Sequence, residues 1–242
     1  MVVVIGGMIR SGSTFSFNIV KEILAQTGTV DISFANSIDS SVFSRADNQH
    51  FILKTHSPDE DILARIKNGS IRCVCTIRRP EDSIASLIRA FGFPLEFGIE
   101  SVKQWLDWYP LVSKLVLSID YGIIDLQHRL AITKIIEYIG LGSDEALIEI
   151  LAERYDKSTL KARFDSLAND ERTVDVGFSY YERQTFFHRR HISSLNSRSA
   201  ALELSPIQID QIRSELRGKY SELDAANVLR VDAGFLRPFD VP

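Results

Sequence analysis

The chain has 242 residues, of which 45% are hydrophobic and 25% charged, enough to bury a substantial core and typical of a soluble globular protein. The formal net charge of -4 argues against a general affinity for nucleic acids or membrane surfaces, so any anion site must concentrate positive charge locally. No apolar run is long enough to span a membrane, and the N-terminus does not read as a signal peptide, so we expect a cytoplasmic location.

Strand and helix patterns alternate through the first 140 residues. Apolar runs predict strands at 1–7, 50–56, 70–77 and 114–121. Amphipathic patterns predict helices at 15–28, 62–69, 83–91 and 126–141, the third of them opened by Pro80. This alternation is typical of parallel strands joined by crossover helices. The fold class is therefore α/β, a central parallel β-sheet flanked by helices in the three-layer arrangement of P-loop NTPases.

Beyond Gly142 the strand patterns stop and helical ones dominate, at 145–155, 158–168 and 207–216. The segment 170–198 is polar, aromatic and rich in arginine, and we expect a surface loop there. No repeat or linker interrupts the chain, so we expect one domain over 1–242 with a helical C-terminal part. Cys73 and Cys75 alternate in a strand and are expected as reduced thiols. No zinc-type spacing of cysteine and histidine occurs, and no metal is expected.

The first polar cluster lies between the opening strand and the first helix. Residues 7–14 have the spacing of a P-loop, except that Ser13 stands where the lysine belongs. The glycines let the backbone approach a ligand, and the N–H groups at the start of the helix suit an oxyanion. Arg10, Ser11 and Thr14 add a cation and hydroxyl donors. The alternative is a glycine turn that only connects strand to helix.

Two further polar clusters follow strands whose carboxyl ends should meet at the same edge of the sheet. Lys54 and His56 end the second strand, where a neutral imidazole can take a proton from a hydroxyl or amine and a lysine can stabilise a transferring anion. Arg78 ends the third strand, and Ser86 lies on the next helix, so the pair can hold a second phosphate. Each cluster alone could be structural. Together, cations and a base suit the transfer of an already activated anionic group.

The three clusters together resemble the PAPS-dependent sulfotransferases. The stretch "IRSGSTF" is similar to the family's P-K-S-G-T-T-W loop, "LKTHSP" to its K-T-H-L-P stretch, and "RRPEDSIAS", with Asp82, to its R-N-x-x-D-x-x-x-S motif. The order and spacing agree over roughly residues 2–140. The resemblance implies a sulfotransferase that moves a sulfuryl group from 3'-phosphoadenosine 5'-phosphosulfate (PAPS) to a hydroxyl or amine and releases PAP.

The resemblance also assigns roles to residues. It implies that His56 is the general base, that Lys54 contacts the sulfuryl group, and that Arg10 acts on the leaving phosphate. For the nucleotide, it implies a 5'-phosphosulfate site at Arg10, Ser11, Gly12, Ser13 and Thr14, adenine contacts at Phe15 and Tyr121, and a 3'-phosphate site at Arg78, Ser86, Arg189 and Arg190.

The chain departs from the family pattern at several points. Arg10 replaces a lysine thought to escort the leaving phosphate, and arginine cannot give up a proton. The late R-K-G-x-x-G-D-W motif is not present as such, and "FFHRRHISS" at 186–194 takes its place, where His188 and His191 either serve the site or shape the loop. Two alternatives stay open: a P-loop kinase or NTPase with an atypical loop, and a catalytically silent nucleotide-binding protein of the same fold.

The segment 91–110 contains phenylalanines together with Trp105, Trp108 and Tyr109. By the resemblance, this region walls the acceptor pocket. Alternatively, the two tryptophans are core residues of a helix. We expect a small-molecule, glycan or lipid acceptor and no nucleic-acid partner, and the oligomeric state is not predicted.

Overall fold

The computed structural model describes residues 1–140, 142, 145–177, 179–188, 192, 200–224 and 228–230. Its central feature is a parallel β-sheet with the strand order β2-β3-β1-β4-β5-β8. The strands are β1 (Val2–Gly6), β2 (Thr29–Phe34), β3 (Gln49–Thr55), β4 (Arg72–Ile77), β5 (Leu117–Asp120) and β8 (Val228–Leu229). The expectation of a central parallel sheet is confirmed.

Strand β1 lies in the middle of the sheet, between β3 and β4. Its residues alternate between two hydrophobic cores: Val3 and Ile5 belong to one, and Val4 to the other. The sheet is therefore buried on both faces, as parallel sheets are. Because the strands are parallel and Gly6 pairs with Thr55, the loop after β1 and the end of β3 emerge at the same edge.

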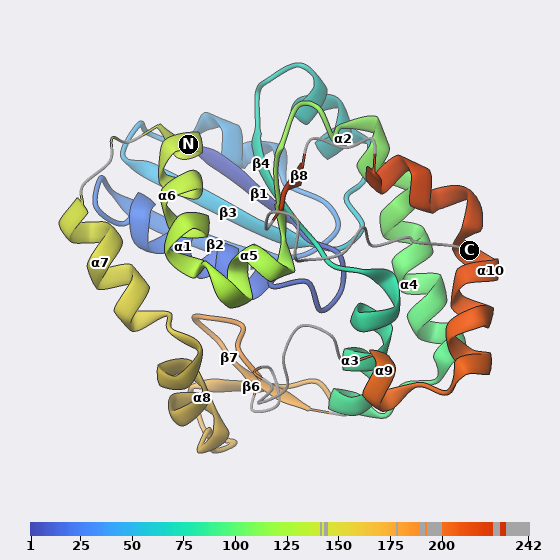
Figure 1. The fold of residues 1–242 in the computed structure, drawn as a ribbon. Helices are drawn as coiled ribbons and strands as arrows, with labels where there is room; N and C mark the ends of the chain where they lie inside the picture. Colours follow the sequence, from blue (N-terminus) through green and yellow to red (C-terminus); the bar gives the residue numbers. More distant parts are fainter. Residues whose placement is uncertain are drawn as a thin grey trace.

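Helices cover both faces of the sheet (Figure 1). One core includes side chains from α1 (Ser13–Leu24), α5 (Tyr121–Leu126), α6 (His128–Ile139), α7 (Glu145–Arg154) and α8 (Lys157–Asp165). The other includes α2 (Glu60–Lys67), α3 (Pro80–Phe91), α4 (Leu95–Trp108), α9 (Ala200–Glu203) and α10 (Pro206–Asp224). The structure also has two short 3₁₀ helices, η1 (Ser40–Ser44) and η2 (Tyr109–Leu111). None of the helices in the part of the chain that the structure describes is long and apolar enough to cross a membrane.

The strands differ from the sequence-based expectations at three places. Strand β2 was not predicted, because it lies at the edge of the sheet and its half-exposed residues mix polar and apolar side chains. The expectation that strands stop at Gly142 was wrong: β6 (Thr173–Asp175) and β7 (Tyr180–Glu182) form an antiparallel hairpin, and β8 joins the sheet. These strands have two or three residues each, too few to show a periodicity.

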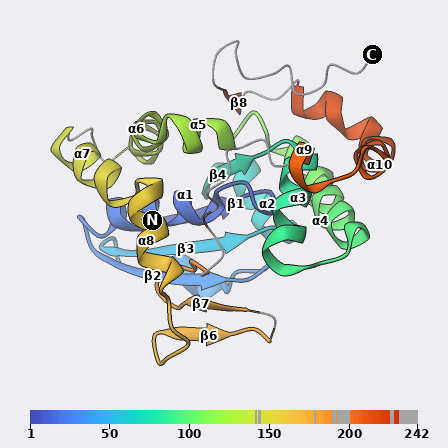
Figure 2. The same cartoon turned by 60° about the horizontal axis from the view of Figure 1, so that its bottom comes forward.

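Figure 2 shows the β6–β7 hairpin outside the central sheet, on the side of β2. The chain after β7 returns toward the sheet, where Phe186 packs on Phe17 of α1 and on Phe34 at the end of β2, with ring centroids 4.8 and 6.0 Å apart. The described part of the segment 170–198 is therefore not the expected surface loop. It forms the hairpin and then packs beside the carboxyl ends of the strands.

Candidate active site

The loop between β1 and α1 forms the floor of the site. Gly12 has a left-handed backbone (φ 93°) and begins α1 without a side-chain cap, so the first N–H groups of the helix are left for a ligand. A Cβ atom at Gly7 would lie 2.4 Å from both the Ser13 Cβ and the Thr76 Oγ1 atoms, and only glycine fits there. The loop therefore provides the tight turn and the donors that bind an oxyanion.

The loop's hydroxyl side chains differ in direction. Ser11 is fully buried, and its Oγ atom lies 2.5 Å from the Met8 carbonyl oxygen and 2.6 Å from the Thr76 hydroxyl. Ser11 thus stabilises the loop through hydrogen bonds inside the protein. Ser13 and Thr14 instead line a cavity above it.

Lys54, near the end of β3, brings a buried ammonium group to this cavity. Its Nζ atom donates a hydrogen bond to Thr14 Oγ1 (2.9 Å) and lies 5.1 Å and 5.9 Å from the ring centroids of Phe34 and Phe186. Burial, with the nearby Arg10 guanidinium, lowers the pKa of Lys54 to about 7. An anion bound beside Lys54 would favour its charged form.

His56 follows β3 and lines the same cavity. Its Nδ1 atom is 2.6 Å from the Gly7 carbonyl oxygen. Because a carbonyl only accepts, Nδ1 carries the proton and Nε2 is left as the acceptor. Burial and the Lys54 ammonium lower the pKa of His56 to about 4, so the imidazole is neutral at pH 7. A neutral ring with a fixed tautomer is able to receive a proton at Nε2.

The third cluster joins the first through two arginines. The Arg78 guanidinium donates to the Arg10 carbonyl oxygen (3.1 Å) and lies 4.2 Å from the centroid of the Tyr121 ring. Arg10 in turn donates from Nε to Ser86 Oγ (3.3 Å). Burial and the charge of Arg78 lower the pKa of Arg10 to about 10, which leaves it charged at pH 7. The structure thus brings Arg78 and Ser86 into contact with Arg10 of the first cluster.

Part of each of the first two clusters lines a cavity of about 350 Å³, which we call the transfer cavity; Arg78 and Ser86 do not line it. Its polar side consists of Arg10, Ser13, Thr14, Lys54 and His56. The remaining lining residues are Ile9, Gly12, Phe34, Leu87, Phe91, Phe93, Phe97, Val176, Tyr181 and His188. None of the described lining residues is acidic. In a chain of net charge -4, this cavity is thus lined by basic and not by acidic side chains among the described residues.

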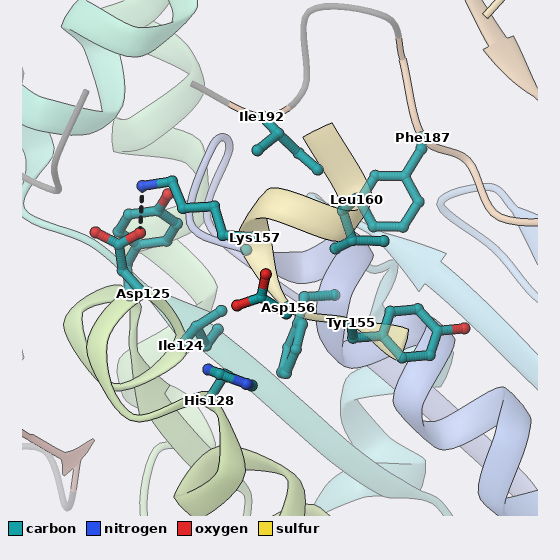
Figure 3. A pocket seen from close by; sticks show the side chains of 12 residues that line it. Ile124, Asp125, His128, Tyr155, Asp156, Lys157, Leu160, Phe187 and Ile192 are labelled. Atoms are coloured by element: carbon teal, nitrogen blue, oxygen red, sulfur yellow. Dashed lines mark hydrogen bonds and ion pairs between the residues drawn. The ribbon is translucent and has the colours of Figure 1, made fainter. Parts of the chain in front are cut away.

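A second, smaller pocket of about 100 Å³ adjoins the transfer cavity, since Gly12 lines both. Phe15 and Tyr121 lie in its wall. Figure 3 shows side chains from α8 and the residues just before it facing Ile124 of α5. At one side of this pocket, Lys157 donates to the Asp125 carboxylate (2.6 Å). The apolar walls suit a flat ring.

Three residues that the sequence analysis named also hold the site in place, through contacts that the sequence did not reveal. The interpretation of Trp105 and Trp108 as core residues is confirmed, at 0% and 5% exposure. Their indole N–H groups, however, also donate to the carbonyl oxygens of Gly6 (2.9 Å) and His56 (3.1 Å). Asp82 accepts from the Ala200 backbone N–H (2.8 Å) and so anchors α9 to α3.

Other cavity residues could not be found because their elements were not predicted. Phe34 ends the edge strand β2, and Tyr181 belongs to the hairpin. His188, for which the sequence left two roles open, lines the transfer cavity. Arg189, Arg190 and His191 lie outside the described residues.

Comparison with protein-family models and with curated proteins finds no match. Solved structures do match. The crystal structure of mouse sulfotransferase SULT7A1 complexed with PAP aligns with 16% identity and a TM-score of 0.59, over 92% of this chain and 87% of that chain. Retinol dehydratase in complex with androsterone and PAP aligns with 13% identity and a TM-score of 0.63, over 96% and 82%. Retinol dehydratase with retinol and PAP aligns with 13% identity and a TM-score of 0.57, over 95% and 83%. The chain shares the fold of these PAP-bound proteins, which confirms the expected fold class.

Proposed function

We propose that the chain is a PAPS-dependent sulfotransferase that transfers a sulfuryl group to a hydroxyl or amine of a small-molecule acceptor. The observation that carries this proposal is the transfer cavity itself: two cationic side chains and a neutral imidazole line one space, in a fold shared with a PAP-bound sulfotransferase. The single domain over 1–242 and the cytoplasmic location stay predictions from the sequence.

The chain's residues fit the anionic donor. The first N–H groups of α1, with Ser13, Thr14 and Lys54, would bind the 5'-phosphosulfate. Arg78 and Ser86 would bind the 3'-phosphate. Half-buried Arg10 and buried Lys54 line a cavity in which no described residue is acidic, so a bound anion would add a countercharge there. Ser11, whose hydroxyl bonds beneath the loop, would act by shaping it.

The adenine would lie in the smaller pocket, between Phe15 and Tyr121. This assignment agrees with the position of Gly12, which lines both pockets. Gly12 would lie between the adenine, in the smaller pocket, and the phosphosulfate, in the transfer cavity. Arg78 also contacts the Tyr121 ring, which would bring the 3'-phosphate site next to the base. Arg189 and Arg190 stay predictions for the 3'-phosphate.

The chemistry follows from these positions. PAPS, when bound, supplies a sulfuryl group whose bond to the 5'-phosphate is already activated. His56 Nε2 would take the proton of the acceptor hydroxyl as the acceptor oxygen forms its bond to sulfur, and the bond from sulfur to the phosphate oxygen would break. Arg10, Lys54 and the α1 N–H groups would stabilise the charge left on that oxygen. Arg10 keeps its proton, so of these two cations only Lys54 could donate one to the leaving phosphate.

The acceptor would occupy the apolar part of the transfer cavity, walled by Phe91, Phe93 and Phe97. This wall suits a small molecule with an apolar or aromatic body. SULT7A1 is named a sulfotransferase, while another PAP-binding neighbour is named a dehydratase. A product analysis should therefore look both for a sulfated acceptor and for an acceptor that has lost water.

The test has two steps. Isothermal titration should show tight binding of PAP and no comparable binding of ATP with magnesium, and PAPS with a panel of phenols, alcohols and amines should then give sulfated products. Binding of ATP with magnesium in place of PAP would favour the kinase or NTPase alternative. PAP binding without transfer to any acceptor would favour a catalytically silent nucleotide-binding protein.

A further inference from the structure

Two side chains hold the peptide group between His56 and Ser57, just past the end of β3. Its carbonyl oxygen accepts a hydrogen bond from the indole Nε1 atom of Trp108 (3.1 Å), the last residue of α4. Its N–H group donates to Thr55 Oγ1 (3.1 Å). Because the two bonds lie on opposite sides of the peptide group, they fix its orientation.

Both of these side chains are themselves buried and held. Thr55 is fully buried, and its hydroxyl donates to Asn36 Oδ1 (3.0 Å), so that the hydroxyl oxygen stays an acceptor for the peptide N–H group. The Trp108 ring lies edge-on to the Trp105 ring, with the centroids 5.6 Å apart. Trp108 also packs so closely on β1 that a Cβ atom at Gly6 would lie 2.7 Å from its ring. These contacts leave neither side chain much freedom to move.

The orientation of the peptide group bears on the His56 ring. Gly6 of β1 pairs with Thr55 of β3, so Gly7 and His56 are the next residues on two neighbouring strands. The Gly7 carbonyl oxygen lies 2.6 Å from His56 Nδ1. A rotation of the peptide group would shift the backbone of His56 relative to Gly7 and lengthen this contact. A neutral imidazole that loses this acceptor can carry its proton on Nε2 instead.

We propose that Trp108 and Thr55 are positioning residues for His56: by fixing the peptide group that follows it, they hold its ring against the Gly7 carbonyl oxygen and so keep the proton on Nδ1. In the other tautomer, the atom that should receive the proton of the sulfuryl acceptor already carries one, and the ring cannot act as the base. The kinetic consequence rests on the proposed function. The tautomer does not, because it is a property of the protein without nucleotide.

The test has two readouts on the full chain. The first is the tautomer of the His56 ring at pH 7 without nucleotide, from nitrogen NMR shifts of its two ring nitrogens, assigned by their absence in His56→Ala. The second is the set of kcat, KM and PAP affinity, measured with PAPS and a sulfated acceptor.

The variants change one hydrogen bond each. Trp108→Phe removes the indole donor and keeps an aromatic ring. Thr55→Val removes the hydroxyl and keeps the branched shape, whereas Thr55→Ser keeps the hydroxyl. Tyr109→Phe is the matched control, because it removes a buried hydrogen bond to Ser118 Oγ (2.8 Å) from a ring next to Trp108.

We expect the Nδ1–H tautomer in the unmodified chain. Trp108→Phe and Thr55→Val should each raise the share of the Nε2–H tautomer and lower kcat about 10- to 100-fold, as small misplacements of a catalytic group do, while KM and PAP affinity change less than about twofold. Thr55→Ser should keep both the tautomer and the rate. Tyr109→Phe should lower the melting temperature and change neither.

An unchanged tautomer in both Trp108→Phe and Thr55→Val would overturn the inference. So would a fall of kcat in Tyr109→Phe as large as in Trp108→Phe, because the loss would then follow from a weakened core. If Trp108→Phe does not fold, the pair Thr55→Val and Thr55→Ser decides the question. If the unmodified chain transfers no sulfuryl group, the proposed function fails, and the tautomers of the variants still decide the role of the two positioning residues.

Discussion

Lys54 should make the binding of PAP depend on pH. In the free protein its pKa is about 7, because the ammonium is buried and lies near Arg10. A phosphate bound beside it would return the pKa toward its ordinary value of 10.5. Below pH 7 the amine is already charged, so binding needs no proton. Above pH 7 each binding event takes up a proton, and the affinity falls as pH rises.

The size of the effect follows from the two pKa values. A full return to 10.5 would weaken PAP about 50-fold between pH 7 and pH 9, and a return only to about 9 would still weaken it about 25-fold. At pH 7 the free amine is half protonated, so binding should take up about half a proton. Arg10, with a pKa of about 10, stays largely charged over this range. The phosphates, with a second pKa near 6, are largely ionised throughout it.

Titration calorimetry at pH 7 and pH 9, in buffers of different ionisation enthalpy, measures both quantities. In Lys54→Met, which removes the amine, and in Lys54→Arg, which stays charged, the affinity should change little between the two pH values. The reasoning would be refuted by equal PAP affinities at pH 7 and pH 9 in the unmodified chain, or by the same fall in Lys54→Met.

Four further predictions concern single residues. His56→Ala should lower the rate of sulfuryl transfer by about 10²- to 10⁴-fold while PAP affinity changes little, and an unchanged rate would remove His56 as the base. Arg78→Ala should weaken PAP about 10- to 100-fold but leave 5'-AMP, which lacks the 3'-phosphate, nearly unaffected; equal losses for both nucleotides would undo this assignment. Gly12→Ala should lower both the melting temperature and PAP affinity, because its φ is 93° and its Cβ would lie 2.7 Å from a neighbouring side chain; an unchanged melting curve would argue against this loop geometry. Trp105→Phe should lower the free energy of unfolding by about 1–3 kcal/mol in chemical denaturation, since it leaves the carbonyl at the end of β1 without its indole donor, and no change would show that this bond adds nothing.

The central strands could be predicted because burial on both faces leaves a strong apolar signal. Strands β1, β3 and β4 read as nearly continuous apolar runs and lie in the interior of the sheet. Edge strand β2 mixes polar and apolar residues, because one side of it has no neighbouring strand. The hairpin strands are too short for any period to appear, and their position depends on packing by residues far away in the sequence.

The parts of the site that follow from strand order were predictable, and the parts that depend on packing between residues distant in sequence were not. Lys54, His56 and Arg78 were grouped correctly because parallel strands bring their carboxyl ends to one edge, a rule that needs no knowledge of side-chain packing. The inward hydrogen bonds of Ser11 depend on Thr76, which is distant in sequence, and could not be predicted from spacing. The contribution of His188 likewise depends on where the hairpin packs.

The central claim is that the transfer cavity moves a sulfuryl group. Its most direct test is incubation of the chain with PAPS that carries radiolabelled sulfur and with a panel of small ring alcohols and phenols, followed by quantification of labelled acceptor and of PAP. The account predicts labelled acceptor and PAP in equal amounts, and their loss together in His56→Ala. PAP binding without any labelled acceptor, or label released only as inorganic sulfate, would contradict it.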